Sequence, residues 1–480
     1  MQSRRDQVQA HMFTMSRLSA AMLRSAPDHP DQPTGRSLRG VLGGLALAFI
    51  VAVLVTIVSV LFPPAREVNW RINGAVVVDV SSGARYLYAD GVLHPVTNLT
   101  SLRLILGSEP SVVAVERAAL VGTPRGAPLG VIGAPERLPD PAGLSRSPWL
   151  ACAGTVGRGT EAVPTFVLEV AASRSVQPLG ADGTLVSAPD DSLHLLVGET
   201  RHLLDAGSGA RESLGYGTAP VRPVPAEFLR LLPAGPDLTP PEVPQRGAGG
   251  PTLAGAPTRI GQLFSGPGGT AYLLTGDGLV PLTPTVLALL VGDPRTQDQA
   301  YDGATPQLVA LGAQDIAEHR STRPLGTRIE ALPSVPPPLT DPAGDDLCAS
   351  VSADQDQPAL TLVTVAATGA PTTGTTGGGR PVLAPGLVPG CGRVDRVIVA
   401  GDTGVLLRTT PTASWYLVAD NGAKYPLGEE GPAPELGFRG QPAAWLPGAL
   451  VDLLPTGPVL DPDVYRDGGT GAAPHRPECD

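Results

Sequence analysis

The sequence has little lysine, few aromatic residues and few cysteines, and the first shortage already excludes a class of enzyme. Only one of the 34 lysines and arginines is a lysine, Lys424, and the residue after it is Tyr425. A P-loop needs a lysine followed by serine or threonine, because the lysine reaches the terminal phosphates and the hydroxyl holds magnesium. The chain therefore has no standard site for hydrolysing nucleoside triphosphates, and no kinase strand lysine either.

Motifs for other catalysts are missing as well. No GxSxG or HExxH sequence occurs, and no two of the four cysteines have CxxC spacing. His94 and His202 share one position of a repeated unit, which favours a structural role for both. The acids beside Cys348, in TDPAGDDLC, are of a type that binds calcium, but the copy of the DPAG turn in the first half of the sequence lacks the extra aspartates. We therefore predict no catalytic, cofactor-binding or metal-binding residues.

The overall composition further restricts the class of protein and the type of fold. The net charge of −11 disfavours a nucleic-acid-binding body. The 59 glycines and 53 prolines, with only 4% aromatic residues, favour short strands and many turns over long helical bundles.

One long apolar segment, residues 41–62, reads VLGGLALAFIVAVLVTIVSVLF and carries no charge. As a helix it would extend about 33 Å, enough to cross the hydrocarbon core of a bilayer. The arginines that precede it are Arg4, Arg5, Arg17, Arg24, Arg36 and Arg39. Only Arg66 and Arg71 follow closely, and Glu67 partly offsets them. This bias predicts a cytoplasmic N-terminus, with residues 63–480 on the other side of the membrane.

The cytoplasmic segment contains a predicted amphipathic helix. Ser3 and Asp6 resemble a capping box at its start. An apolar stripe follows at helical spacing, made of Val8, Met12, Met15, Leu18 and Met22. The helix cannot bury this stripe alone, so it should dock on a partner protein or lie on the membrane surface. The methionines and the sparse flanking arginines favour a partner.

A short unit recurs along the rest of the chain, as an apolar run, a turn and a second apolar run. Its four copies begin at Tyr86, His194, Tyr272 and Tyr416. The turn dipeptides at residues 90–91, 277–278 and 421–422 predict tight hairpins, because Asp, Asn and Gly tolerate positive φ. Helices should follow two of the hairpins, capped by Thr97 and Thr283.

A larger duplication encloses these units. DPAG occurs at residues 140–143 and 341–344, and a cysteine follows each copy, Cys152 or Cys348. PTFVLEVAAS, from Pro164, matches PALTLVTVAAT, from Pro358. Two similar halves should pack about an approximate two-fold axis, and equivalent residues can meet only there.

This symmetry predicts a disulfide between Cys152 and Cys348, which in the loop-entropy model contributes roughly 5 kcal/mol to stability. Two buried free thiols are the alternative. Asp345 and Asp346 are then expected to be solvated turn residues. Cys391 and Cys479 have no counterparts in the first half, and whether they pair with each other stays open.

The chain resembles the EccB family, a core membrane component of type VII (ESX) secretion systems, as far as about residue 460. The stretches that carry the resemblance are RRDQVQAHMFTMSRLSAAMLR, the apolar segment, VNWRINGAVVVDVSSGARYLYADGVLHPVTNLTSLRLILG, and RGAPLGVIGAPERLP with the Trp149 and Cys152 that follow it.

The resemblance implies an α+β, β-rich fold. One N-terminal transmembrane helix would lead into a pseudo-two-fold periplasmic body, in which four small repeat domains surround a central β-sheet domain with the Cys152–Cys348 disulfide. It implies membership in an oligomeric machine of the inner (plasma) membrane, with self-association and with EccC, EccD, EccE and the mycosin protease as partners. A non-catalytic structural scaffold is the leading hypothesis for its role. An ATP-hydrolysing component with a non-standard site and a cell-wall-binding anchor are the alternatives; some family members are described as ATPases.

The predicted division of the chain follows from these observations. It comprises a cytoplasmic segment (1–40), a transmembrane helix (41–62), repeat 1 (63–110), the first half of the central domain (111–190), repeat 2 (191–239), a linker (240–257), repeat 3 (258–300), the second half of the central domain (301–408), repeat 4 (409–460) and a C-terminal tail (461–480).

Overall fold

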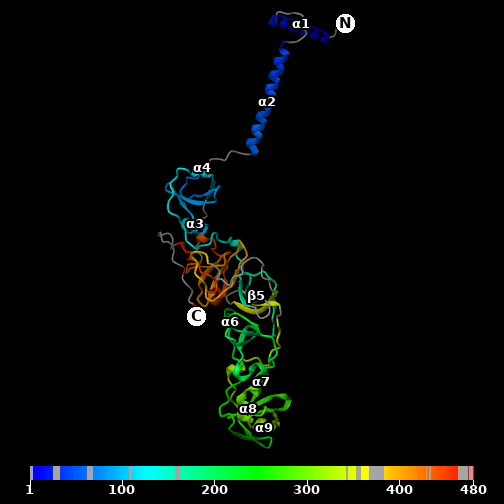
Figure 1. The fold of residues 1–480 in the computed structure, drawn as a ribbon, viewed down its shortest axis with the longest axis vertical. Coiled ribbons are helices and arrows are strands. Elements are labelled where there is room, and N and C mark those ends of the chain that lie inside the picture. The colour runs from blue at the N-terminus through cyan, green and yellow to red at the C-terminus, as the bar shows by residue number, and fades with distance from the viewer. Residues whose placement is uncertain are drawn as a thin grey trace. The chain divides into compact units, whose positions relative to one another are not determined.

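The computed structural model describes residues 4–24, 33–61, 69–107, 111–156, 163–341, 344–352, 358–366, 383–428, 430–431, 434–462, 474 and 479. The chain, shown in Figure 1, divides into two compact units, Met1–Ile72 and Asn73–Asp480. Ser3, the predicted capping residue, and most of the predicted tail lie outside the described residues.

The described residues of the first unit form two helices, α1 (Arg4–Arg24) and α2 (Pro33–Leu61). The apolar stripe of α1 is exposed, with Met12 at 65% and Met22 at 81% of full accessibility. Within α2, the 20 residues Arg39–Val58 are long and apolar enough to cross a membrane, and none of this segment is buried. The helix begins ahead of residue 41 because Pro33 suits the first helical position.

The second unit is built mainly from short strands, which form four small sheets of identical strand order. In each sheet the first three strands form an antiparallel meander, and the fourth pairs with the first in parallel. The first sheet contains β1 (Val76–Asp79), β2 (Arg85–Ala89), β3 (Val92–Pro95) and β4 (Val112–Val115). The second contains β8 (Thr184–Ser187), β9 (Leu193–Val197), β10 (Thr200–Leu203) and β11 (Arg222–Pro223). The third contains β14 (Leu263–Ser265), β15 (Ala271–Thr275), β16 (Gly278–Leu282) and β17 (Val309–Ala310). The fourth contains β21 (Val405–Thr410), β22 (Trp415–Val418), β23 (Lys424–Pro426) and β24 (Ala444–Pro447).

Helices occupy the connections between the third and fourth strands. In the first and third sheets these are α3 (Leu99–Leu106) and α7 (Pro284–Gly292), the latter followed by α8 (Pro294–Ala300). Thr283 caps α7 as predicted, since its side chain accepts from the Val286 amide. The predicted cap of α3 is wrong: Asn98, not Thr97, has the extended backbone and accepts from the Ser101 amide at 2.9 Å.

Shorter helical segments complete these connections. The second sheet has η3 (Ala206–Ser208) and α5 (Ala210–Ser213), and the fourth has η5 (Pro434–Leu436). A short helix also follows each fourth strand, namely α4 (Arg117–Leu120), α6 (Ala226–Leu231), α9 (Ala313–Glu318) and α11 (Gly448–Val451). The other short helices in the described part of the unit are η1 (Pro141–Gly143), η4 (Pro267–Gly269) and α10 (Thr327–Glu330).

The predicted turns form at all three dipeptides but differ in backbone geometry. Both Asp90 (φ 50°) and Gly91 (φ 82°) have positive φ, as a two-residue type I′ hairpin requires. At Asp277-Gly278 and Asn421-Gly422 only the glycine has positive φ, so these hairpins use other turns.

A sheet of six strands combines the two halves of the sequence, in the order β20-β6-β5-β18-β19-β7. From the first half come β5 (Trp149–Val156), β6 (Val163–Glu169) and β7 (Gln177–Pro178). From the second half come β18 (Asp345–Ser352), β19 (Ala359–Ala366) and β20 (Arg396–Ile398). The antiparallel pairing of β5 with β18 joins the halves. Near β5, Figure 1 shows a teal strand of the first half beside a yellow strand of the second half.

Several elements extend across the predicted boundaries. Residues 240–257, for which the sequence predicts a linker, include β12 (Gly249–Leu253) and the start of β13 (Ala256–Arg259), which pair with a bulge. The fourth strands β4 and β17 lie beyond the ends predicted for repeats 1 and 3, at residues 110 and 300. A strand that pairs in parallel with a distant partner leaves no hairpin signal in the sequence, so its membership in the sheet cannot be seen there.

The apolar core of the second unit is divided among these sheets. The largest cluster combines the central sheet with the second and fourth sheets and includes Trp149, Phe166, Phe228, Leu407 and Leu450. Another cluster joins the second sheet to the third, and a further one joins Leu104 of α3 to the fourth sheet. The first sheet thus contacts the fourth through α3, and the second contacts the third through α5 and α7.

Candidate functional site: the disulfide of the central sheet and the buried charges

Cys152 and Cys348 form a disulfide in the middle of the central sheet. They lie directly opposite each other in the register of β5 and β18. Their sulfur atoms are 2.09 Å apart, their Cα atoms are 4.0 Å apart, and both residues are buried. The covalent bond therefore joins the two halves of the sequence at the strand pair where they meet.

The sequence of β5, WLACAGTV, explains why a sheet forms here with both faces covered. Its first six residues are buried. Alternate residues point to opposite faces of a strand, so Trp149, Ala151 and Ala153 join the largest core cluster. Leu150 and Cys152 join a smaller cluster with Cys348 on the other face.

The acids beside Cys348 do not have the setting that we predicted. Asp345 and Asp346 begin strand β18, and neither is exposed. Burial raises the pKa of the Asp346 carboxyl above its usual value, while Arg174 and Arg222 lower it in part. The expectation of two solvated turn residues is wrong, because the strand begins directly after Gly344 and carries both acids into the sheet.

A second disulfide joins Cys391 and Cys479, with sulfur atoms 2.12 Å apart. The Cys391 amide donates to the backbone oxygen of Asp452 at 2.6 Å, which places this bond beside the helix α11 of the fourth sheet. Cys479 itself is exposed.

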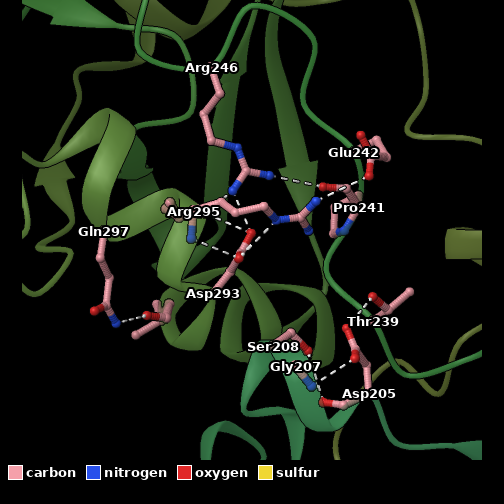
Figure 2. A network of polar contacts seen from close by, with 12 residues as sticks. Asp205, Gly207, Ser208, Thr239, Pro241, Glu242, Arg246, Asp293, Arg295 and Gln297 are labelled. Carbon is pink, nitrogen blue, oxygen red and sulfur yellow. Dashed lines mark hydrogen bonds and ion pairs between the residues drawn. The ribbon is translucent and has the colours of Figure 1, made fainter.

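A buried carboxylate, Asp293, forms the centre of the polar network in Figure 2. Its side chain is 1% exposed and pairs with Arg246, which is 4% exposed. Arg295 Nε lies 3.1 Å from its other oxygen, which also accepts the Arg295 amide at 3.0 Å and so caps α8. Burial alone would raise the pKa of Asp293, but the two guanidinium groups outweigh this effect and lower it.

The same network fixes residues 240–257 onto the third sheet. Arg246 donates to the backbone oxygen of Pro241 at 3.2 Å and to Thr296 Oγ1 at 2.7 Å, and Arg295 pairs with Glu242 at 3.1 Å. On the side of the second sheet, Thr239 donates to Asp205 at 3.1 Å (Figure 2). No sequence motif indicates this network. The Asp293-Pro294 pair signals a helix start, but nothing in the sequence identifies Arg246, 47 residues away, as its partner.

Lys424, the one lysine, is not placed to meet a nucleotide. The residue is 1% exposed, its ammonium pairs with Asp452, and the nitrogen lies 5.2 Å from the ring centre of Tyr416. Burial lowers the pKa of its ammonium, and Asp452 opposes that effect. The ammonium is thus engaged in an ion pair between β23 and the end of α11.

His94 and His202 lie in the same local setting, as their shared repeat position predicts. Nδ1 of His94 is 3.0 Å from the Ala127 oxygen, and Nδ1 of His202 is 2.8 Å from the Pro236 oxygen. Each ring packs on a glycine, where an added Cβ would come within about 2.4 Å of ring atoms. Among the described residues, no group of three or more His, Cys, Asp or Glu side chains is arranged to hold a metal ion.

Comparison with known proteins assigns the family. The EccB profile, described as "Type VII secretion system ESX-1, transport TM domain B", matches residues 1–466. The chain belongs to the EccB family. The family that the sequence resembles is therefore confirmed.

Relatives in this family come from several ESX systems. The "ESX-3 secretion system ATPase EccB3" of Mycolicibacterium smegmatis is 28% identical over 495 residues, which cover 95% of this chain and 89% of that protein. The "ESX-1 secretion system ATPase EccB1" of Mycobacterium tuberculosis is 27% identical over 477 residues, covering 95% and 93%.

Solved EccB structures share the fold. A chain of an intact ESX-5 inner membrane complex aligns with a TM-score of 0.61 at 22% identity, covering 100% of this chain and 97% of that chain. A chain of the EccB3 dimer from the ESX-3 core complex aligns with a TM-score of 0.58 at 25% identity, covering 81% and 98%. The predicted mixed, β-rich fold with one N-terminal apolar helix is thus confirmed.

Proposed function

We propose that this EccB-family chain is a single-pass scaffold of a type VII secretion inner-membrane complex. One observation carries the proposal: in the sequence, an unburied apolar helix of membrane-spanning length precedes a β-rich body whose two halves are bonded within one sheet. A body that is cross-linked by a disulfide in this way is suited to keeping a fixed shape while its surfaces bind other subunits.

In this proposal the N-terminus is cytoplasmic and the body is periplasmic. The arginine bias around α2 supports this orientation. The disulfides support it independently, because disulfides persist in oxidising compartments and both of them lie in the second unit. The same orientation leaves the exposed stripe of α1 on the side of cytoplasmic partners.

The partners that we propose are EccC, EccD, EccE and the mycosin protease, with further copies of this chain. The solved structure of an EccB3 dimer from an ESX-3 core complex supports self-association. The stripe of α1 supports a cytoplasmic contact, since a helix with five apolar residues on one exposed face gains stability by docking.

ATP hydrolysis is the second candidate, because the relatives are named ATPases. The engagement of Lys424 with Asp452 speaks against a phosphate-binding role for this lysine. Purified chain that hydrolyses ATP, and loses this turnover in a single point variant without unfolding, would establish the enzyme instead of the scaffold. A cell-wall anchor, the third candidate, requires that the second unit sediment with insoluble peptidoglycan.

The stripe of α1 gives the sharpest test of the scaffold. Met12→Asp with Met15→Asp places two charges at its centre, whereas Ala10→Asp, which adds one charge on the opposite face of the helix, is the control. We expect the double variant to lose at least tenfold in co-purification with the other membrane components, and the control to retain it. Both variants should stay in the membrane. Equal recovery of partners with the double variant would contradict the docking role.

A further inference from the structure

A cavity of about 400 Å³ lies where three parts of the second unit meet. Leu99, Thr100 and Arg103 of α3 line one part of it, together with Val112 of β4. Residues 137–141 line another part, and turns of the fourth sheet line the rest. Its volume falls in the range of small-molecule sites, about 300–1,000 Å³. The scaffold proposed above makes no use of this cavity.

Three carboxylates line it. Asp402 precedes β21 and Asp420 follows β22, and the pairing of Val405 with Val418 brings these two turns to the same end of the strand pair. Asp140 lines it from residues 137–141, and one of its oxygens accepts the Ala142 amide at 2.9 Å. None of the three has an ion-pair partner in the described part of the chain, so their charges are available to a cation.

Groups that favour an anion line the same cavity. Arg137 has no ion-pair partner among the residues described, and Thr100 stands in the first turn of α3, where the helix dipole is positive. Thr100 is 1% exposed, and its hydroxyl has no hydrogen-bond partner among the described atoms. A buried hydroxyl left without a partner is costly, and a ligand acceptor would satisfy it.

We propose that this cavity binds a small zwitterion, an amino acid or a short peptide with free ends. The carboxylate of the ligand would bind Arg137 and Thr100, and its ammonium would bind the pair Asp402 and Asp420, with Asp140 nearby. A metal ion fits less well, because these acids are not grouped as metal ligands among the described residues.

The probe is L-alanyl-L-alanine, compared with its N-acetylated form and its C-terminal amide. Each blocked form has nearly the same size and lacks one charge. We expect the free dipeptide, at millimolar concentration, to raise the thermal unfolding midpoint of the full chain in detergent, because a ligand that binds only the folded state stabilises it. Calorimetric titration should show at least tenfold weaker binding for each blocked form.

Variants identify the cavity as the site. Arg137→Gln, and Asp402→Asn combined with Asp420→Asn, should each abolish the shift. Asn tolerates the positive φ of residue 402 (57°), so the turn is kept. Thr100→Val should weaken binding, whereas Thr285→Val is the matched control: Thr285 in α7 is equally buried, also has an unpartnered hydroxyl, and does not line this cavity.

Three results would overturn the proposal. The first is no shift with the free dipeptide at 20 mM, which is about 20 times a weak millimolar Kd. The second is an equal shift with the amide, which would make the cavity a cation site only. The third is an undiminished shift in Arg137→Gln. None of these results bears on membrane anchoring or on co-purification of partners, so the scaffold is tested separately.

Discussion

Arginine supplies nearly all the positive charge of this chain, and two arginines meet at one buried carboxylate, Asp293. A buried ion pair is costly to form, because both ions lose water, and costly to break, because removal of one partner leaves an uncompensated charge. Arg246 and Asp293 keep 4% and 1% of their side-chain surface exposed. Arg259 and Asp302 keep 42% and 76%. The two pairs have the same chemistry, but the first is buried and the second is exposed to solvent.

This contrast predicts different costs for the same substitution. Arg246→Met should lower the free energy of unfolding by about 3–5 kcal/mol, since it leaves Asp293 buried with only Arg295 beside it. Arg259→Met, the control, should cost less than about 1 kcal/mol, because that pair is solvated. Calorimetric unfolding of the full chain measures both. Similar losses in the two variants would show that the network in Figure 2 does not hold residues 240–257.

Asp346 predicts a dependence of stability on pH. Burial raises the folded-state pKa of the Asp346 carboxyl above its usual value, so the folded state holds the proton more tightly than the unfolded state. Its contribution to stability is therefore greatest below about pH 4 and is lost as pH rises through the folded pKa. At neutral pH the ionised carboxylate destabilises the fold.

Asp346→Asn should accordingly raise the unfolding midpoint at pH 7, and the gain should shrink as the pH falls below about 4. Thermal scans at the two pH values measure this difference. Asp191→Asn, at an exposed turn, is the control and should change little at either pH. A gain that is the same at both pH values would mean that the carboxylate charge is not the cause.

Residues that depend on local pattern were predictable, and residues that depend on distant partners were not. The duplication around DPAG singled out Cys152 and Cys348 without any structural knowledge. The same comparison misplaced Asp345 and Asp346, because the first copy has no acids there and gave no sign that the strand begins so early. The ion pair of Arg246 with Asp293 joins residues that are 47 positions apart and meet only in the folded chain.

At the scale of elements, the hairpins and the helices α3 and α7 were predicted because their signals are local. These signals are a turn dipeptide between apolar runs, or a polar residue of capping type before an apolar helical run. The fourth strand of each sheet was missed. These strands contain two to four residues and pair in parallel with a strand far back in the sequence, so neither alternation nor a turn marks them.

The two disulfides enclose loops of 196 and 88 residues. The loop-entropy model assigns both about 5 kcal/mol, so chain entropy alone barely distinguishes them. Their surroundings differ, because Cys152 and Cys348 are buried in the central sheet and Cys479 is exposed. Cavities in a sheet core add to the cost of truncating a side chain.

The double variant Cys152→Ala, Cys348→Ala should therefore lower the unfolding midpoint more than Cys391→Ala, Cys479→Ala. Calorimetry of the two purified variants, with the unmodified chain under reducing conditions as a reference, measures the difference. Equal losses would mean that the disulfide of the central sheet contributes no more than that of the tail.

At the scale of the whole molecule, the proposed membrane orientation decides on which side of the membrane each unit lies. The arginine bias and the two disulfides are independent signs of the same arrangement, because one arises from membrane insertion and the other from redox chemistry. The disulfides also make the orientation measurable, since all four native cysteines are bonded and no free thiol competes for a label.

A membrane-impermeant maleimide applied to intact spheroplasts should then label Asp191→Cys, in an exposed turn of the second unit, and leave Ser16→Cys, in α1, unlabelled until the membrane is opened with detergent. The unmodified chain should remain unlabelled in both conditions unless it is first reduced. Labelling of Ser16→Cys before lysis would reverse the topology. The exposed stripe of α1 would then face the periplasm, and partners on that side would have to replace the cytoplasmic ones proposed here.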